Sequence, residues 1–270
     1  MIPNVLAIAG SDPSGGAGVQ ADIKTITANG GYAMAALTAL TAQNTREVVG
    51  VEPVEPAFVA RQIDAVFADV RVDAVKVGMI ATAAIAEAVA DALVRHGARR
   101  VVLDPVMIAK GGDRLLAEAA VETLRARLVP LAGVLTPNLP EAAALLGRDE
   151  ARSRDAMAGQ AEALRALGPG AVLLKGGHLD GDASPDLLRT AGTTAWLDAP
   201  RVATRNTHGT GCTLSSAVAA LWAREDDVET ACRLAKDYVS GAIAGADALS
   251  VGSGHGPLDH AFALRRPATE

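Results

Sequence analysis

The sequence predicts an α/β fold in which a central, mostly parallel β-sheet carries helices on both faces. Short apolar segments alternate along the 270 residues with longer, alanine-rich segments of helical periodicity. The short segments are almost continuously apolar, as expected for strands that are buried on both faces. Polar and glycine-rich clusters follow several of them, and ligands of open α/β sheets bind where such strands end. We therefore expect a three-layer αβα architecture with a ligand site at the strand ends.

Six strands are predicted from the apolar segments. They span residues 4–10, 32–40, 73–79, 100–106, 133–138 and 171–177. Residues 180–198 break the alternation of strand and helix, because two short apolar runs are separated there by turn residues. We expect a small hairpin in this segment, at one edge of the sheet.

Eight helices are predicted between and after the strands. They span residues 16–29, 56–70, 82–96, 115–127, 139–147, 153–167, 209–223 and 227–248. In the third of them, apolar residues recur at helical spacing and Gly97 supplies a stop signal. No linker, fixed-period repeat or low-complexity tract is visible, so we expect one domain over residues 1–270.

Composition narrows the classes of function. The net charge is −6 and only 3% of residues are aromatic, so the basic surface and stacking platforms of a nucleic-acid binder are missing. Two cysteines cannot build a disulfide framework, which favours a reducing, cytoplasmic location. We find neither a signal peptide nor an uninterrupted apolar segment of about 18 residues, so no membrane partner is expected. A small polyanion could still bind to backbone amides.

The segment "NTHGTGCTLSS" (206–216) is a candidate anion site. Gly209 and Gly211 allow close approach of a ligand to the backbone, and the amides of a first helical turn attract phosphate. No Gly-Lys-Ser/Thr follows, so this is not a Walker A loop. A tight turn that merely caps the helix explains the same spacing, and the pattern alone does not choose between the two. His208 is interpreted as a turn residue without an assigned role.

Cys212 stands at the expected start of the helix that follows. A thiol at a helix N-terminus has a lowered pKa, and its thiolate could accept a proton from a hydroxyl group that attacks a phosphoryl group. The ordinary alternative is a small buried side chain. Cys232 lies in mid-helix, and we interpret it as a core residue.

Several motifs occur together in one order along the chain. They are "AGSDPSGGAGVQADIKT", "ALTAQNT", "VKVGMI", "DPVMIAKGG", "LTPNLPEAAALLG", "LLKGGH", "THGTGC" and "GHGPLDH". Together they resemble the hydroxymethylpyrimidine and phosphomethylpyrimidine kinases of thiamine biosynthesis, from about residue 5 to residue 260. The resemblance implies a ribokinase-like, Rossmann-type fold and a homodimer. It also implies ATP-dependent phosphorylation of 4-amino-5-hydroxymethyl-2-methylpyrimidine and then of its monophosphate, with ATP as co-substrate and Mg²⁺ as cofactor.

The resemblance also implies roles for individual residues near the phosphates. Cys212 stands where the wider superfamily has a catalytic aspartate, and Gly209, Gly211 and the Cys212 amide would form the anion hole. The implied positions for ATP, phosphate and metal are Asp104, Asn138, Glu141, Lys175 and Thr210, with Asp104 and Glu141 toward Mg²⁺. Glu141 could instead be a first-turn glutamate favoured by the helix dipole, and Lys175 an exposed lysine at a strand end.

Gln43 carries the expectation for the substrate. An aminopyrimidine presents a donor and an acceptor on one edge, and a glutamine amide can meet both. The resemblance places Gln43 on this edge and adds Gly10, Asp22, Met79 and Val106 as pocket residues, although core packing would also explain Met79 and Val106. Residues 109–113 ("AKGGD") are expected to form a flap over the substrate.

Two other functions remain open on the sequence. A pyridoxal kinase shares the fold and phosphorylates the hydroxymethyl group of another small aromatic ring. A degenerate member of the fold could act as a ligand sensor that binds the pyrimidine without consuming ATP. Gln43 favours the pyrimidine over pyridoxal, and the complete set of glycines, cysteine and Asn-x-x-Glu residues favours an enzyme over a sensor.

Overall fold

The computed structural model describes residues 1–107 and 118–265. Within them, the main sheet has eight strands in the order β10-β9-β8-β7-β6-β5-β1-β2. Its strands are β1 (Asn4–Ala9), β2 (Tyr32–Leu37), β5 (Ala74–Val77), β6 (Val101–Leu103), β7 (Val134–Leu135), β8 (Ala171–Lys175), β9 (Asp186–Arg189) and β10 (Thr194–Leu197). In this sheet order, the neighbouring strands β8, β7, β6, β5, β1 and β2 all run parallel. Strand β9 is antiparallel to both β8 and β10. The predicted fold class and the edge hairpin are therefore confirmed, with the hairpin strands starting at residue 186.

The helices follow the predicted segments closely. They are α1 (Gly18–Ala28), α2 (Pro56–Asp69), α3 (Ala83–Arg95), α4 (Glu118–Thr123), α5 (Leu139–Leu146), α6 (Arg154–Arg165), α7 (Thr210–Glu225) and α8 (Val228–Ala244). After α4 the chain continues as a π-helical turn over Leu124–Leu128 and a 3₁₀ turn over Val129–Leu131. The first three residues of the helix predicted at 115–127 lie outside the described residues.

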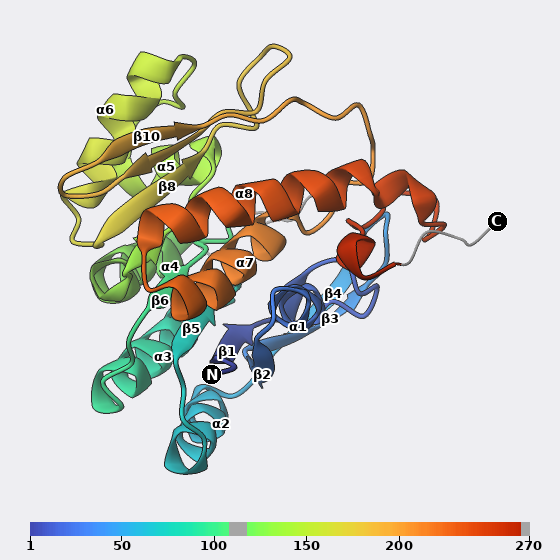
Figure 1. Cartoon of the computed structure of the whole chain (residues 1–270). Helices are drawn as coiled ribbons and strands as arrows, with labels where there is room; N and C mark the ends of the chain where they lie inside the picture. Colours follow the sequence, from blue (N-terminus) through green and yellow to red (C-terminus); the bar gives the residue numbers. More distant parts are fainter. Residues whose placement is uncertain (108–117, 266–270) are drawn as a thin grey trace.

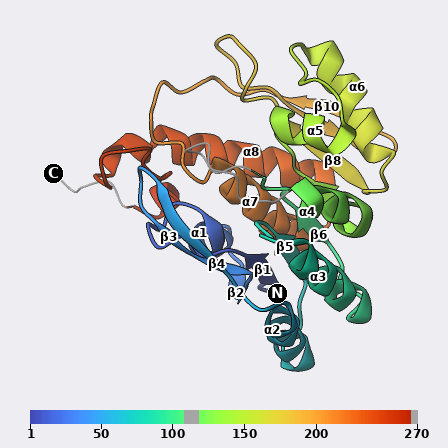
Figure 2. The ribbon, with the colours of Figure 1, turned by 180° about the vertical axis from the view of Figure 1, so that it is seen from behind.

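Helices cover both faces of the sheet. Figures 1 and 2 show α1, α7 and α8 on one face and α2 to α6 on the other. Neighbouring residues of a strand point to opposite faces, and β1 shows this directly. Its Leu6 and Ile8 belong to the hydrophobic core under α2 and α3, whereas Val5 and Ala7 belong to the core under α7 and α8. This explains why the strand segments are apolar at every position.

The segment predicted as one strand over residues 32–40 is divided. Thr38 separates β2 from β3 (Ala39–Gln43), which pairs with β4 (Val48–Pro53) in a separate antiparallel sheet. The buried Thr38 side chain donates to the carbonyl of Met79, which fixes the chain where it leaves the main sheet. The predicted segment is apolar apart from Thr38 and its Tyr32 hydroxyl, and one threonine does not mark the end of a strand, because threonine is common in strands. The turn between β3 and β4 does have a recognisable residue in the sequence, Asn44. Its Oδ1 accepts from the amides of Arg46 and Glu47.

No helix within the described part of the chain has the length and apolar character needed to cross a bilayer.

Candidate active site

A cavity of about 640 Å³ opens where the parallel strands of the main sheet end. Strand β2 lies on one side of β1, and the next strand of this sheet along the chain, β5, lies on the other side. Such a reversal of strand order marks the usual ligand crevice of an open α/β sheet. The turns after β1, β5, β6, β7 and β8 contribute to the wall, together with β3 and the start of α7. The predicted site residues in the wall are Gly10, Gln43, Met79, Asp104, Val106, Asn138, Glu141, Lys175, Gly209, Thr210, Gly211 and Cys212.

The glycine turn before α7 is sterically required. Gly209 is the N-cap residue and has φ +83°, a left-handed conformation that glycine adopts without strain. A Cβ atom at this position would lie 1.8 Å from the carbonyl oxygen of Gly16, in the loop after β1. The first turn of α7 starts at Thr210 and faces the cavity. The Thr210 amide donates to the Thr207 carbonyl, whereas the Gly211 and Cys212 amides are available to an anion as helix N-termini generally are.

Asp104 and Lys175 lie directly beside this turn. Lys175 Nζ is 2.8 Å from Asp104 Oδ1, and a Cβ atom on Gly211 would be 3.2 Å from both Lys175 Nζ and Asp104 Oδ2. Burial alone would lower the pKa of Lys175, but the carboxylates of Asp104 and Glu141 raise it. Lys175 is therefore a fixed cation at the anion site. The strand-end lysine is not solvent-exposed.

Asn138 and Glu141 have a structural role and a place in the cavity at the same time. Asn138 Oδ1 accepts from the Glu141 amide at 2.8 Å, and Glu141 Oε2 accepts from the Asn138 amide at 2.8 Å. This reciprocal pair is the capping box of α5. Burial raises the pKa of Glu141 to about 7, with nearby Lys175 opposing the shift and Asp104 adding to it.

The thiol of Cys212 differs from the sequence expectation. Cys212 is the third residue of α7 and lies in the cavity wall. Burial raises the pKa of its thiol to about 11, although the charge of Lys76 acts in the opposite direction. The predicted lowering of the pKa is therefore wrong, because burial outweighs the charge of Lys76 and the hydrogen bond from the Gly18 amide. At neutral pH the resting side chain is the thiol.

Gln43 faces a histidine that sequence reasoning left without a role. His208 Nε2 lies 2.8 Å from Asp12 Oδ2 and 3.4 Å from Gln43 Nε2, and all three residues line the cavity. Burial alone would raise the pKa of Asp12, but hydrogen bonds with His208 and Ser14 outweigh it and lower this pKa to about 2. The only sequence signal for His208 was its position beside Gly209.

Gly10, Met79 and Val106 form the apolar part of this end of the cavity. A Cβ atom on Gly10 would come within 2.9 Å of Met79 Sδ, so a larger residue at this position would displace the methionine. Asp22 is not brought to the cavity wall. It is fully buried, with both carboxylate oxygens 2.8–2.9 Å from Lys76 Nζ and one of them accepting from Ser216 Oγ. The flap expected at residues 109–113 lies outside the described residues.

The opposite end of the cavity has an apolar wall and a polar loop. Leu214, Val239 and Ile243 come from α7 and α8, and Gly177 and Ser184 come from the loop between β8 and β9. Sequence reasoning assigned none of these residues.

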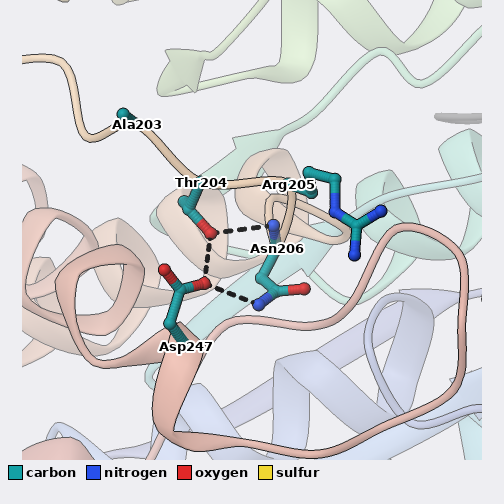
Figure 3. A pocket seen from close by; sticks show the side chains of 5 residues that line it. All are labelled: Ala203, Thr204, Arg205, Asn206 and Asp247. Atoms are coloured by element: carbon teal, nitrogen blue, oxygen red, sulfur yellow. Dashed lines mark hydrogen bonds between the residues drawn. The ribbon is translucent and has the colours of Figure 1, made fainter.

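A second, more open hollow adjoins the segment that leads into the glycine turn (Figure 3). Asp247, just after α8, accepts from Thr204 Oγ1 and, at 2.7 Å, from Asn206 Nδ2. The Thr204 hydroxyl also accepts from the Asn206 amide at 3.1 Å. These contacts anchor residues 204–206 to the end of α8 and so help to fix the approach to Gly209.

Comparison with known proteins shows the family. Residues 12–259 match the family described as phosphomethylpyrimidine kinase. The chain is 54% identical to the hydroxymethylpyrimidine/phosphomethylpyrimidine kinase of Escherichia coli, covering 95% of this chain and 97% of that protein. It is 51% identical to the enzyme of the same name from Rhizobium meliloti, over 94% of this chain and 96% of that protein.

Solved structures give the same picture of the fold. A phosphomethylpyrimidine kinase from Clostridium difficile is 40% identical, with a TM-score of 0.80, covering 90% of this chain and 100% of that one. The ADP complex of Bacillus subtilis pyridoxal kinase is 35% identical, with a TM-score of 0.89, covering 98% of this chain and 99% of that one. The fold is therefore shared by kinases that act on different rings, and the sequence match decides the assignment. The chain is a kinase with a ribokinase-like fold and belongs to the phosphomethylpyrimidine kinase family.

Proposed function

We propose that this kinase transfers the γ-phosphoryl group of ATP to the hydroxymethyl oxygen of 4-amino-5-hydroxymethyl-2-methylpyrimidine. The same site then phosphorylates the monophosphate to the diphosphate, as a step of thiamine biosynthesis. The observation that carries the proposal is one cavity with a ring-binding end at Gln43 and an anion site at Gly209–Cys212. Relatives that share about half of their residues with this chain and bear both activities in their names support it.

The ring-binding end suits an aminopyrimidine. The Gln43 amide supplies a donor and an acceptor in one plane, while Met79 and Val106 supply apolar contacts to the ring. His208 Nε2 donates to the Asp12 carboxylate, so the histidine lies beside the Gln43 amide nitrogen without accepting from it. The hydroxymethyl group would then point toward Cys212.

ATP would occupy the rest of the cavity. The apolar wall of Leu214, Val239 and Ile243 suits the base, and the amides of Gly211 and Cys212 suit the transferring phosphoryl group. Lys175 adds a fixed positive charge beside the same turn. In the transfer, the hydroxymethyl oxygen bonds to the γ-phosphorus, the bond to the bridging oxygen breaks, and ADP leaves.

The carboxylates in the wall fit Mg²⁺. Asp104 Oδ2 is buried and has no hydrogen-bond partner among the described residues, which is the state of an oxygen that a cation would complete. Within the described ranges no group of three or more candidate ligating side chains occurs, and Mg²⁺ usually keeps several waters. Asp104 and Glu141 would hold the hydrated ion, which supplies charge neutralisation on the phosphates when bound.

The protein would act in the cytoplasm as a homodimer. Its two copies would associate through the small sheet of β3 and β4. This sheet exposes Leu40, Val49 and Val51, and Val49 is 70% exposed. Large exposed apolar residues gathered on one element are typical of an interaction surface. Light scattering should give a mass twice that of the chain, and replacement of Val49 by Lys should shift it toward the monomer.

Exchange of Gln43 for Met tests the ring-binding end. The variant keeps the size of the side chain but loses both amide contacts, so kcat/KM for the aminopyrimidine should fall by about 10- to 100-fold. Gln62→Met is the matched control, because Gln62 bonds to the backbone of Leu37 outside the cavity wall. Wild-type protein should prefer the aminopyrimidine to pyridoxal, and the opposite preference would move the assignment to a pyridoxal kinase.

A further inference from the structure

The loop between β8 and β9 is held by hydrogen bonds from the side chain of one arginine. Arg201, in the segment after β10, donates to four carbonyl oxygens of this loop. Its Nε donates to Gly181 at 2.8 Å and its Nη1 to Gly177 at 2.9 Å. Its Nη2 donates to Leu179 at 2.6 Å and to Ala183 at 3.2 Å. Every second residue from 177 to 183 therefore contacts the same guanidinium group.

This arrangement depends on the chemistry of arginine. A guanidinium is planar, always charged and carries five N–H donors in a fixed fork, whereas a lysine ammonium is a compact point charge. Only the fork reaches carbonyls on several sides of one plane. Backbone hydrogen bonds join the same two segments. The Arg201 amide donates to the Asp182 carbonyl and the Ser184 amide donates to the Ala199 carbonyl, both at 2.8 Å.

A second cation holds the far end of the loop. Lys236 of α8 donates to the Ser184 carbonyl at 2.8 Å and to Asp186 Oδ2 at 2.7 Å. Asp186 Oδ1 in turn accepts from the Gly176 amide at 3.0 Å, next to Lys175. The loop therefore begins at the lysine beside the anion site and is tied at its middle and at both ends.

The position of the loop points to the ligand that it serves. Gly177, His178 and Ser184 line the cavity beside the apolar wall of α7 and α8, as does Arg201 itself, and none of the ring-binding residues belongs to this loop. We propose that Arg201 is a positioning residue for the nucleotide, because it presets the loop whose Gly177, His178 and Ser184 form the polar wall against which ATP binds. This inference rests on the proposed function, which assigns this end of the cavity to ATP.

Loss of the fork should affect one substrate and spare the other. In Arg201→Gln the four carbonyls lose their shared donor, so the loop must be ordered when the nucleotide binds and the cost appears in the affinity for ATP. We expect KM for ATP to rise about tenfold or more, while KM for the aminopyrimidine changes less than twofold. Arg201→Lys should recover only a small part, because an ammonium cannot span the four oxygens.

Amide hydrogen exchange and ADP titration give readouts that do not require turnover. Residues 177–183 should exchange faster in Arg201→Gln than in wild type, and saturating ADP should restore protection, with ADP bound about tenfold more weakly. Arg154→Gln is the matched control, since Arg154 pairs with Asp198 and covers Trp196 without contacting the loop. The thermal midpoints of both variants show whether each is folded.

The outcomes separate the inference from the proposed function. Equal increases in both KM values, or unchanged exchange and unchanged ADP affinity in the Arg201 variants, would overturn the positioning role. Wild-type protein that binds ADP but makes no pyrimidine phosphate would overturn the proposed function and leave the ADP comparison valid. Wild-type protein that does not bind ADP would overturn both.

Discussion

The Cys212 thiol is subject to two opposing influences. The N-terminus of α7 and the charge of Lys76 favour the thiolate, whereas burial favours the neutral thiol and raises its pKa to about 11. At pH 7 only a small fraction of the molecules then carries the thiolate. Much of the charge stabilisation in phosphoryl transfer must therefore come from the turn amides and Lys175, with Cys212 taking the hydroxyl proton in the ionised fraction.

This account predicts a specific pH profile. Between pH 8 and pH 10, above the titration of Glu141, kcat/KM for the aminopyrimidine should rise about tenfold per pH unit, because the thiolate fraction of the free enzyme rises by that factor. Cys212→Ala should lose about 10²- to 10⁴-fold in rate and show a flat profile over this range.

Cys232→Ala is the control for that measurement, because Cys232 is fully buried in α8 and should leave the profile unchanged. A wild-type profile that is already flat, or a Cys212→Ala variant with full activity, would show that Cys212 serves only as part of the helix start.

At the scale of elements, the C-terminal segment holds the start of α7. The Thr213 hydroxyl donates to the Gly209 carbonyl at 2.8 Å and lies 3.0 Å from His260 Nε2, so the ring donates to Thr213 as a neutral imidazole. Burial lowers the pKa of His260 to about 4, with the charge of Lys24 adding to the shift and Asp259 opposing it. The glycine turn is thus supported from outside the cavity.

Acid should therefore weaken the fold through His260. Its pKa is about 6.5 in an unfolded chain and about 4 here, so the unfolded state binds more protons between these values. The contribution of neutral His260 to the free energy of unfolding is fully present above pH 6.5. It is lost as the pH falls to 4, by up to about 3 kcal/mol. Urea unfolding should show a smaller loss of stability over this range in His260→Gln than in wild type.

His255→Gln provides the comparison, because His255 is exposed and should keep the wild-type dependence on pH. If both variants lose stability in parallel with wild type, the buried histidine does not account for the acid sensitivity.

At the scale of the whole molecule, the cavity is assembled from residues that are far apart in the sequence. The strand ends were predictable, because continuous apolar runs followed by polar clusters place Gly10, Met79, Asp104 and Lys175 on one edge of a parallel sheet. The twelve predicted residues in the cavity wall followed from this edge and from the family resemblance.

Other features depend on contacts that periodicity does not encode. Asp12 and His208 are 196 positions apart, and nothing in either local sequence indicates their pairing. Asp22 has the polarity of a ligand-binding residue, yet Lys76 neutralises it inside the fold. The division of the second predicted strand was missed for a different reason. Thr38 is polar, but threonine is common within strands, so it gives no sign that the chain leaves the sheet there.

The central claim is that one cavity performs two successive phosphorylations of the same ring. The most direct test is a mass-spectrometric time course with purified protein, Mg·ATP and 4-amino-5-hydroxymethyl-2-methylpyrimidine, run beside a matched pyridoxal reaction. We expect the pyrimidine monophosphate to appear first and the diphosphate to follow, with much less product from pyridoxal. Phosphorylation of pyridoxal alone, or no phosphorylated product from either ring, would contradict the account.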